Sequence, residues 1–559
     1  MAPPMGKLMA QAVDEIAQSD PSRVFAEFLD PPHTTVDSLT LTFGALAAAV
    51  DRLGWWLEDV KKKHQLNELD ACAYIGFPDL RYYVVLLACI KCRLKVLFTA
   101  PSNSTAAHNL LMQQAGCKVL LLTEEMPLEE LKTISALPSL CIPSVATLLE
   151  DGVSTPFPYA KTFEEARNDP VVVRCYIPFA SSQRLLGHSN TRALRLQYLH
   201  SSGTTGRPKL RLWTNLHLSN FSILAKLPEF DGSKLIPMYQ RAAEAGTVRY
   251  MAVLGIFHVS MTSVLQASIF GDKYCVLTPY HIQSVTAAHM KDWIKRARPD
   301  IMISFPAKFS MALEDTEYFD LLATVPLIYY VGAALDAELG AKLSKQTHVC
   351  SAWGSTEIAF LPSYRLGPED WQYVKLDCAS LGIEWRSHGN DGESELVLVR
   401  NDKLQQPPQY VFSTFPELEE YPSGDLFKPH PTKQHQWRFS RRIDETIILS
   451  TAQNINPLLL ERQITEHPLV RSATLLGNNR LRLCLVLELN NGCKASVVDE
   501  EIWPFIQQHL LDKSQYEQFG RDDVIMVDPK RPLPRGMKGN VVRSLLYDLY
   551  RDEIYGKAA

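Results

Sequence analysis

A loop rich in small and hydroxyl-bearing residues is the segment of this chain best suited to chemistry. Residues 201–209 read Ser-Ser-Gly-Thr-Thr-Gly-Arg-Pro-Lys. Glycines let the backbone approach a phosphate closely, and N–H and hydroxyl groups then donate hydrogen bonds to its oxygens. Lys209 adds a mobile positive charge. The composition therefore predicts a triphosphate-binding loop made by Ser201, Ser202, Gly203, Thr204, Thr205, Gly206 and Lys209.

A second segment places a hydroxyl beside a carboxylate. Residues 353–357 read Trp-Gly-Ser-Thr-Glu. The Thr356 hydroxyl and the Glu357 carboxylate offer hard oxygen ligands, which suit a Mg²⁺ ion bridged to phosphate oxygens. The same residues are also typical of a helix N-terminus, because Ser and Thr are common N-caps. The segment therefore indicates either a magnesium–phosphate site or the start of a helix.

The order of these and further motifs resembles the signatures of the adenylate-forming (ANL) superfamily. That superfamily includes acyl-CoA synthetases, firefly luciferases and the adenylation domains of nonribosomal peptide synthetases. Each motif is weak by itself, and a lone Ser-Gly-Asp is typical of an ordinary turn. Their order and spacing carry the resemblance. The segments concerned are 201–209, 257–258, 332–335, 353–357, 423–425, 442–444 and 533–543.

The resemblance implies a role for each residue that matches a motif. Thr356 would bind the α-phosphate of ATP, and Glu357 would hold Mg²⁺. Asp425 of Ser-Gly-Asp would accept hydrogen bonds from both ribose hydroxyls, and Arg442 would also contact the ribose. Asp444 would be the hinge between two domains.

The acid pocket is also assigned by resemblance. Phe257-His258 resembles an aromatic-His element beside the acyl site, where amino-acid-activating domains commonly place an aspartate for the substrate ammonium group. A missing carboxylate favours an aryl, keto or fatty acid. Residues 332–335 read Gly-Ala-Ala-Leu and resemble a loop near the adenine and the acyl group. We therefore assign Phe257, His258, Val259, Phe305, Trp353 and Gly354 to the acid pocket, and Gly332 and Ala333 to the nucleotide site.

The catalytic lysine is expected near the C-terminus. Residues 533–543 read Leu-Pro-Arg-Gly-Met-Lys-Gly-Asn-Val-Val-Arg. They resemble the Lys-Gly-Thr-Val-x-Arg form of fungal nonribosomal-peptide-synthetase-like enzymes of the carboxylic acid reductase type, which predicts Lys538 as the catalytic residue. In such proteins a phosphopantetheine carrier domain follows. No Gly-x-(Asp/His)-Ser-Leu carrier site occurs in this sequence, so we expect a carrier supplied in cis by a longer protein or in trans.

Three segments depart from the pattern that the resemblance implies. Arg441 stands where the superfamily usually has glycine, and residues 451–453 read Thr-Ala-Gln where the fungal group typically has Asn-Gly-Glu. The lysine segment, residues 533–543, lacks the Gly-Lys pair of the usual family form. A residue other than glycine at position 441 affects the backbone conformation of its loop.

The elements that must position these residues are indicated by apolar runs. Short, continuous apolar runs separated by helix-like segments predict an α/β fold with buried sheets. Examples are residues 71–76, 118–123, 250–254, 274–277, 301–304 and 327–331, with a helix at 82–90. A run at 194–199 predicts a strand that leads into the 201–209 loop.

The domain organisation combines these elements with the resemblance. We expect a large N-terminal adenylate-forming domain of layered β-sheets and helices, residues 1–443, that binds ATP and the acid. A small, mobile α+β C-terminal domain, residues 444–559, would carry Lys538. Within it, the patterns predict strands at 472–477 and 481–489 and helices at 501–511 and 541–553.

The bulk composition restricts the class of protein. The chain has 559 residues, 46% hydrophobic and 21% charged, with a net charge of -5. It therefore lacks the basic character of a nucleic-acid binder, and no apolar run is long enough for a membrane span. The N-terminal residues lack the apolar core of a signal peptide. Eleven scattered cysteines are typical of reduced core thiols, so we expect a cytoplasmic protein.

The function that these features predict is ATP- and Mg²⁺-dependent adenylation of a small carboxylic acid, followed by acyl transfer to a phosphopantetheine thiol. Aromatic pocket residues favour an aryl or keto acid, and a betaine-type acid stays open because aromatic rings also bind quaternary ammonium groups. One alternative is a stand-alone ligase with coenzyme A as the acceptor. Another is a catalytically inactive adenylate-forming fold that acts as a binding protein.

Overall fold

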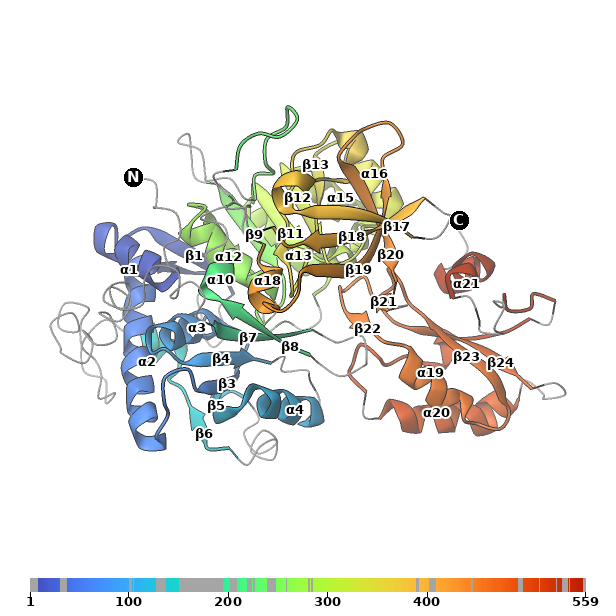
Figure 1. Ribbon diagram of the computed structural model, residues 1–559, viewed down its shortest axis with the longest axis horizontal. Coiled ribbons are helices and arrows are strands. Elements are labelled where there is room, and N and C mark those ends of the chain that lie inside the picture. The colour runs from blue at the N-terminus through green and yellow to red at the C-terminus, as the bar shows by residue number, and fades with distance from the viewer. Residues whose placement is uncertain are drawn as a thin grey trace.

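The computed structural model arranges the chain in several β-sheets with helices packed on their faces (Figure 1). Not every residue is described. The described residues are 9–30, 38–99, 103, 105–126, 137–149, 195–201, 209–218, 224, 227–238, 248–257, 259–279, 282, 285–388, 392–401, 409–443, 446–490, 496–511, 513–528, 530–534, 541 and 543–555.

Two large, mostly parallel sheets form the body of the molecule. The seven-stranded sheet has the order β13-β12-β11-β9-β10-β1-β2, and only β2 runs antiparallel to its neighbour. Its strands are β1 (Val24–Leu29), β2 (Ser38–Thr42), β9 (Arg249–Val253), β10 (Tyr274–Leu277), β11 (Ile301–Ser304), β12 (Leu327–Val331) and β13 (His348–Ala352).

The six-stranded sheet has the order β6-β5-β3-β4-β7-β8, and only β8 is antiparallel, paired with β7. Its strands are β3 (Ala71–Ile75), β4 (Lys95–Phe98), β5 (Cys117–Leu122), β6 (Ser139–Cys141), β7 (Arg195–Ser201) and β8 (Lys209–Thr214). The hairpin of β7 and β8 brings Ser201 opposite Lys209, so the two ends of the predicted phosphate loop lie side by side.

Helices surround and separate these sheets. The helices on the two sheets are α1 (Met9–Ser19), α2 (Phe43–His64), α3 (Arg81–Lys91), α4 (Thr105–Ala115), α6 (Val145–Leu149), α10 (Asn215–Leu218), α12 (Val259–Ile269), α13 (Ala287–Ala297), α14 (Pro306–Ser310), α15 (Thr316–Ala323) and α16 (Ala337–Leu343). Their ends are marked by local signals. The Thr42 hydroxyl caps α2 by accepting from the Ala45 amide, and Asp336 caps α16 through the Leu339 amide.

The layers follow from the fact that the central strands are buried on both faces. In β9, Tyr250 and Ala252 face a core shared with the six-stranded sheet, whereas Met251 and Val253 face a second core. Helices α2, α3 and α12 contribute to the shared core. Helices α13, α15 and α16 contribute to the second core, and α4 packs on the other face of the six-stranded sheet. This double burial explains the continuous apolar runs of the sequence, and the predicted α/β class is confirmed.

A third, antiparallel sheet lies between these layers and the C-terminal part of the chain (Figure 1). Its order is β16-β20-β19-β18-β17, with β16 (Val374–Lys375), β17 (Ile383–His388), β18 (Glu393–Val399), β19 (Glu420–Pro429) and β20 (Gln436–Arg442). Small helices α17 (Cys378–Leu381) and α18 (Val411–Thr414) accompany it. Aromatic side chains hold its core, where Trp385 and Trp437 stack with centroids 3.7 Å apart.

The C-terminal part of the chain builds a smaller sheet with its own hydrophobic cores. Its elements are β21 (Ile447–Ile448), β22 (Asn454–Ile455), α19 (Leu458–Thr465), β23 (Val470–Leu476), β24 (Cys484–Leu489), a π-helical turn (Val498–Ile502), α20 (Trp503–Leu510), β25 (Val524–Met526), α21 (Arg543–Leu549) and α22 (Arg551–Tyr555). Strand β24 pairs antiparallel with β23 and parallel with β25. A domain boundary between residues 443 and 444 stays our proposal.

Element bounds differ from the sequence prediction at four places in this part. Strand β23 runs from Val470 to Leu476 rather than over 472–477. Strand β24 begins at Cys484 rather than at Leu481, because pairing with β23 starts opposite Leu476. The helix expected at 501–511 is preceded by the π-helical turn. The helix expected at 541–553 is divided into α21 and α22 at Tyr550, a buried residue whose hydroxyl donates to the Arg531 carbonyl oxygen.

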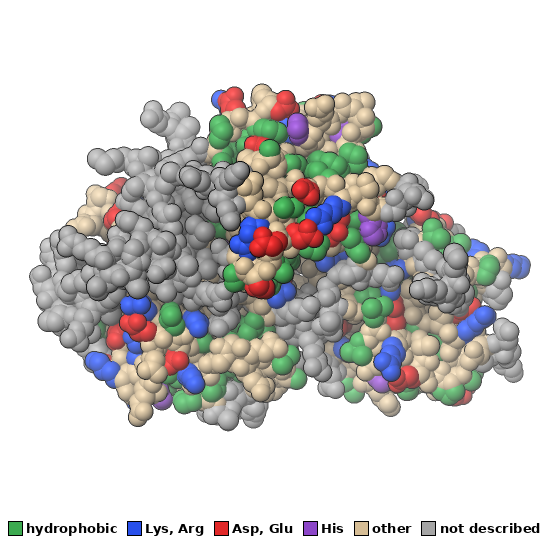
Figure 2. Space-filling model, viewed as in Figure 1, with side chains coloured by type: hydrophobic (Ala, Val, Ile, Leu, Met, Phe, Trp, Pro, Cys, Tyr) green, Lys and Arg blue, Asp and Glu red, His purple; other side chains and the backbone are tan. Residues whose placement is uncertain are grey.

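The surface and two of the helices give further information about the class of protein. On the face shown in Figure 2, acidic and basic side chains lie close together among apolar and neutral ones. Cys89 lies in α3 and Cys92 caps its C-terminal end, and both are buried. In the part of the chain that is described, every helix is too short or too polar to cross a bilayer.

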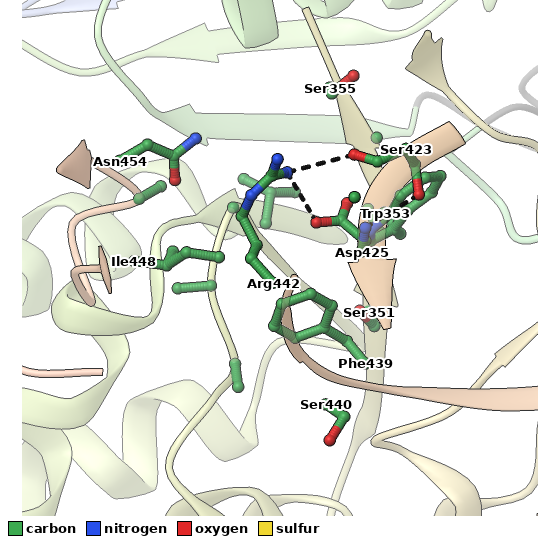
Figure 3. Close-up of a pocket in the computed structure, with 18 of the residues that line it drawn as sticks. Ser351, Trp353, Ser355, Ser423, Asp425, Phe439, Ser440, Arg442, Ile448 and Asn454 are labelled. Atoms are coloured by element: carbon green, nitrogen blue, oxygen red, sulfur yellow. Dashed lines mark hydrogen bonds and ion pairs between the residues drawn. The ribbon is translucent and has the colours of Figure 1, made fainter. Parts of the chain in front are cut away.

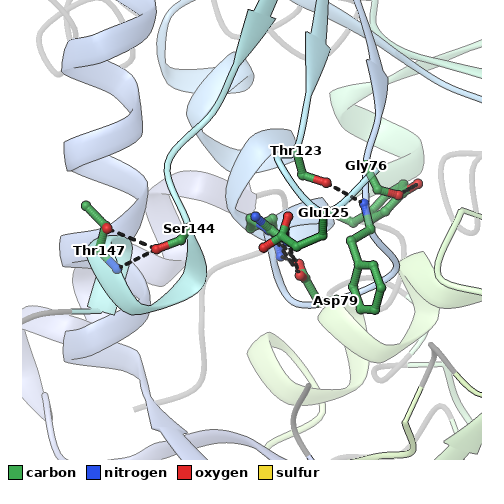
Figure 4. Close-up of polar contacts among 9 residues, drawn as sticks. Gly76, Asp79, Thr123, Glu125, Ser144 and Thr147 are labelled. Carbon is green, nitrogen blue, oxygen red and sulfur yellow. Dashed lines mark hydrogen bonds and ion pairs between the residues drawn. The ribbon is translucent and has the colours of Figure 1, made fainter. Parts of the chain in front are cut away.

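A buried ionic cluster ties α3 to the carboxyl ends of β3 and β5 (Figure 4). Arg81 is 1% exposed, and its Nη2 lies 2.6 Å from Oδ2 of Asp79 and 3.0 Å from Oε2 of Glu125. The Arg81 backbone amide also donates to Asp79. Nearby, the Thr123 hydroxyl accepts from the Phe77 amide at 2.9 Å. One guanidinium thus balances two acidic side chains at the start of the helix.

Replacing Arg81 should therefore be strongly destabilising. Arg81→Met leaves Asp79 and Glu125 without their counter-charge, and loss of one partner of a buried ion pair costs about 3–5 kcal/mol. Urea unfolding followed by tryptophan fluorescence measures the change. Arg386→Met is the matched control, since Arg386 pairs with Glu420 on the surface and its loss should leave the unfolding midpoint nearly unchanged. Equal effects of the two variants would contradict this role for the cluster.

The hairpin of β21 and β22 packs against the end of β12. Gly332 follows β12 with a φ of 82°, and a Cβ placed on it would lie 2.2 Å from the Cβ of Ala452 at the hairpin tip. Ala452 itself has a φ of 61°. The Ala307 amide donates to the Ser450 carbonyl oxygen at 3.1 Å. The hairpin tip therefore fits onto a surface that only a glycine leaves open.

We predict that Gly332→Ala loosens this contact. Alanine at a positive φ costs about 1–2 kcal/mol, and here the methyl group would also push the hairpin away. Gly232→Ala is a close control, because Gly232 has a φ of 68° and a Cβ there meets nothing within 4 Å. Hydrogen exchange should accelerate at residues 446–455 in Gly332→Ala alone. Similar exchange in both variants would show that backbone strain, and not the contact, is responsible.

Candidate active site

A cavity of about 860 Å³ lies where β12, β13 and the antiparallel sheet meet the hairpin of β21 and β22. Figure 3 shows Arg442 and Asp425 on one wall, with Ile448 and Asn454 of the hairpin on another. Predicted site residues that line it are Gly332, Ala333, Phe305, Trp353, Gly354, Thr356, Glu357, Asp425 and Arg442. The structure therefore brings together residues that are far apart in the sequence.

Asp425 and Arg442 form one side of the cavity. They are paired residues of the neighbouring strands β19 and β20, and Nη1 of Arg442 lies 2.9 Å from Oδ1 of Asp425. The Arg442 Nη1 also donates to the Ser423 carbonyl oxygen at 3.5 Å. Gly424 has a φ of 73°, and a Cβ there would lie 2.9 Å from Nη2 of Arg442. The Ser-Gly-Asp motif thus lies within a strand, and its glycine makes room for the arginine.

Thr356 and Glu357 also line the cavity, in a tight turn. The turn joins β14 (Gly354–Ser355) to β15 (Ala359–Phe360), and Ala359 has a φ of 63°. The Ile358 amide donates to the Ser355 hydroxyl at 3.3 Å. Thr356 and Glu357 are each 9% exposed. The helix start that the sequence also allowed is wrong, because the chain turns back into β15 directly after Glu357.

Two residues of β8 hold this turn, and the sequence prediction did not include either of them. Trp213 Nε1 donates to the Thr356 carbonyl oxygen at 2.8 Å, and Arg211 Nε donates to Oε1 of Glu357 at 2.5 Å. Both lie two residues apart on one strand that follows the predicted phosphate loop. The only available signal was that Arg211 and Trp213 follow Lys209 by two and four residues, a spacing typical of one face of a strand. This spacing does not identify Glu357, which lies 146 residues from Arg211 along the chain.

Tyr421 is a further residue that the sequence prediction missed. It lines the cavity and stacks on Phe415 with ring centroids 5.6 Å apart. Burial, followed by the nearby acidic group of Glu357, raises the pKa of its hydroxyl well above the ordinary value. Tyr421 therefore stays protonated at neutral pH and lines the cavity as a neutral aromatic residue.

Other predicted site residues lie elsewhere or are not described. Phe257 packs partly buried against the large core and is not among the residues that line the cavity. Val259 begins helix α12. The outer part of the phosphate loop (Ser202, Gly203, Thr204, Thr205 and Gly206), His258, Asp444 and Lys538 lie outside the described residues. The backbones of Ser201 and Lys209 are paired where the loop begins and ends.

The donor set fits a nucleotide and a hard cation. Gly332, next to which Ala452 packs, is one of the cavity-lining residues, and Asp425 offers carboxylate oxygens beside Gly424. Thr356 and Glu357 supply the hydroxyl and carboxylate oxygens that Mg²⁺ prefers. Among the residues described, no three His, Cys, Asp or Glu side chains gather as a metal site. A Mg²⁺ ion at Glu357 would therefore complete its coordination with phosphate oxygens and water.

Comparison with known proteins gives the chain two family matches. Residues 13–385 match the model of AMP-binding enzymes, and residues 444–557 match the model of the AMP-binding enzyme C-terminal domain. The chain is similar to a carboxylic acid reductase of Neurospora crassa, with 27% identity over 99% of this chain and 51% of that protein. It is also similar to the adenylate-forming reductase Nps11 of Serpula lacrymans, with 23% identity over 86% of this chain and 43% of that protein.

The comparison with solved structures concerns the fold alone. A double mutant of o-succinylbenzoate CoA synthetase from Bacillus subtilis superposes with a TM-score of 0.62 at 16% identity. The match covers 96% of this chain and 98% of that one. This chain spans about half or less of the length of the curated relatives described above. Because the family model covers more than half of the chain, the chain belongs to the AMP-binding enzymes, a family of acid-adenylating enzymes.

Proposed function

We propose that the chain adenylates a carboxylic acid that is not an ordinary amino acid and transfers the acyl group to a phosphopantetheine thiol. The observation that carries this proposal is the convergence of Thr356, Glu357, Asp425 and Arg442 on one cavity beside Gly332. The carboxylic acid reductase from Neurospora crassa, a relative by sequence, supports a carboxylic acid as the substrate class.

In the proposed reaction a carboxylate oxygen attacks the α-phosphorus of ATP. A new oxygen–phosphorus bond forms, the bond from the α-phosphorus to the bridging oxygen breaks, and pyrophosphate leaves with that oxygen. Both reactants are anions, so the enzyme must hold them together and stabilise the charge that develops. Asp425 and Arg442 would hold the ribose, and Thr356 would donate to the α-phosphate. A bound Mg²⁺ ion supplies Lewis-acid stabilisation of phosphate oxygens.

The chemistry of the acid follows from the walls of the cavity. Phe305, Trp353 and Phe360 line it together with Tyr421. Aromatic walls suit a flat aryl or keto acid. The sequence has His258 where amino-acid-activating domains place a carboxylate, which argues against an α-ammonium group on the substrate. We therefore propose an aryl or arylalkyl acid, with a betaine-type acid as the second choice.

The substrate class can be tested by pyrophosphate release with ATP, Mg²⁺ and a panel of acids. The panel holds benzoates, arylpyruvates, medium-chain fatty acids, betaines and amino acids, and we expect release with an aryl or keto acid. A thiol acceptor is then offered as coenzyme A or as a carrier protein with its phosphopantetheine arm. Acyl-CoA formation would point to a stand-alone ligase. ATP binding without pyrophosphate release from any acid would instead favour an inactive fold.

The role of Lys538 can be tested by measuring the two half-reactions, adenylation and thioester formation, separately. We propose that Lys538 lies between the carboxylate and the α-phosphate during adenylation and withdraws before the thiol enters. Lys538→Ala should then lower adenylation by about 10²–10³ while sparing thioester formation from preformed acyl adenylate. Lys530→Ala is the control, because Lys530 is an exposed lysine nearby in the sequence. Equal loss of both half-reactions would contradict the proposed role.

A further inference from the structure

The acidic side chain proposed to bind Mg²⁺ already has a cationic partner from another sheet. Arg211 Nε lies 2.5 Å from Oε1 of Glu357, and the two side chains are 18% and 11% exposed. Both residues line the cavity. An ion pair this close, and largely removed from water, is not a loose surface contact. Arg211 therefore occupies the position from which a metal ion would approach this oxygen of Glu357.

Contacts of Arg211 hold its side chain near the start of β8, where the predicted phosphate loop ends. Its Nη1 donates to the Leu210 carbonyl oxygen at 3.0 Å, one residue after Lys209. Its guanidinium carbon lies 5.5 Å from the ring centroid of Phe415. A guanidinium so placed keeps donors available in a flat fork, a geometry that matches phosphate oxygens. Arg211 thus follows Lys209 by two residues on β8 and binds the turn at Glu357.

We propose that Arg211 is a phosphate-binding residue that exchanges partners when the nucleotide binds. Before binding it balances Glu357. With ATP bound, the guanidinium would donate to a phosphate oxygen, and Glu357 would be released from Arg211 to hold Mg²⁺. This inference rests on the proposed function, and goes beyond it by adding a cation of the chain itself to the phosphate site.

The exchange has two opposite thermodynamic consequences. Arg211 competes with Mg²⁺ for Glu357 and repels it, so the arginine weakens metal binding. It also attracts the triphosphate, so it strengthens nucleotide binding in the absence of metal. A residue that only braces the turn would change both affinities in the same direction. The sign of the two effects therefore distinguishes phosphate binding from a structural role.

The experiment is calorimetric titration of ATP into the full chain, with EDTA and with graded free Mg²⁺. In EDTA, Arg211→Met should bind ATP roughly tenfold to a hundredfold more weakly than the original protein, as expected for one charge-assisted hydrogen bond. The gain in ATP affinity on adding Mg²⁺ should be roughly tenfold larger in Arg211→Met, and half of it should be reached at a lower Mg²⁺ concentration. Arg211→Lys keeps the charge. Its ATP affinity in EDTA and its gain in affinity on adding Mg²⁺ should therefore lie between those of the original protein and of Arg211→Met.

Arg249→Met is the matched control. Arg249 also pairs with a glutamate, Glu27, at 3.0 Å and lies over an aromatic ring, Tyr274, at 4.6 Å, and it is not among the cavity residues. Loss of Arg249 should leave the affinity for ATP in EDTA and the affinity for Mg²⁺ unchanged. If Arg211→Met lowers the two affinities together, or changes neither, the inference fails while the proposed function stands. If the original protein binds no ATP, the proposed function fails and this inference fails with it.

Discussion

The site depends on a balance of charge between two acidic side chains and two arginines around one cavity. Glu357 is bound by Arg211, and Asp425 is bound by Arg442. Both acids line a space that we propose takes anionic reactants, so each would repel the phosphate and carboxylate groups of those reactants without a counter-charge. Asp425 and Arg442 lie on neighbouring strands of one sheet. Arg211 and Glu357 come from β8 and from the turn after β14, so their pair forms only when these parts of the chain pack together. Tyr421 lines the same cavity, and the charges of both pairs act on its hydroxyl.

This balance requires that the elements around the cavity hold these residues in fixed positions relative to one another. Strand β8 must present Arg211 and Trp213 to the turn after β14, and both contacts use the same face of the strand. The packing of the two large sheets on a shared core fixes β8 relative to β13. On the other side, direct pairing of β19 with β20 places Asp425 opposite Arg442. Long-range packing therefore positions one pair, and a local hairpin positions the other.

The same division explains what could be predicted from the sequence. The buried strands were predictable because both faces are apolar. Asp425 and Arg442, which line the cavity, could be proposed as site residues because each belongs to a short motif. Arg211 and Trp213 were missed because their function depends on a contact with Thr356 and Glu357 that no local pattern encodes. Phe257 was assigned to the pocket because Phe257-His258 resembles an aromatic-His motif, and it is not among the residues that line this cavity. Single-residue placement in a pocket depends on tertiary packing, which a motif does not specify.

The departures at Arg441 and at residues 451–453 have different physical costs. Arg441 replaces a glycine within the extended backbone of β20, where any residue fits, and its Nη2 reaches Oε2 of the buried Glu393 at 2.9 Å. Ala452 is different, because its φ of 61° is a conformation that favours glycine and costs an alanine about 1–2 kcal/mol. Its methyl group in return contacts Gly332 at the cavity. Neither change removes a group that the proposed chemistry uses. These two departures are therefore better explained as adjustments of packing at the edge of the site than as loss of an active one.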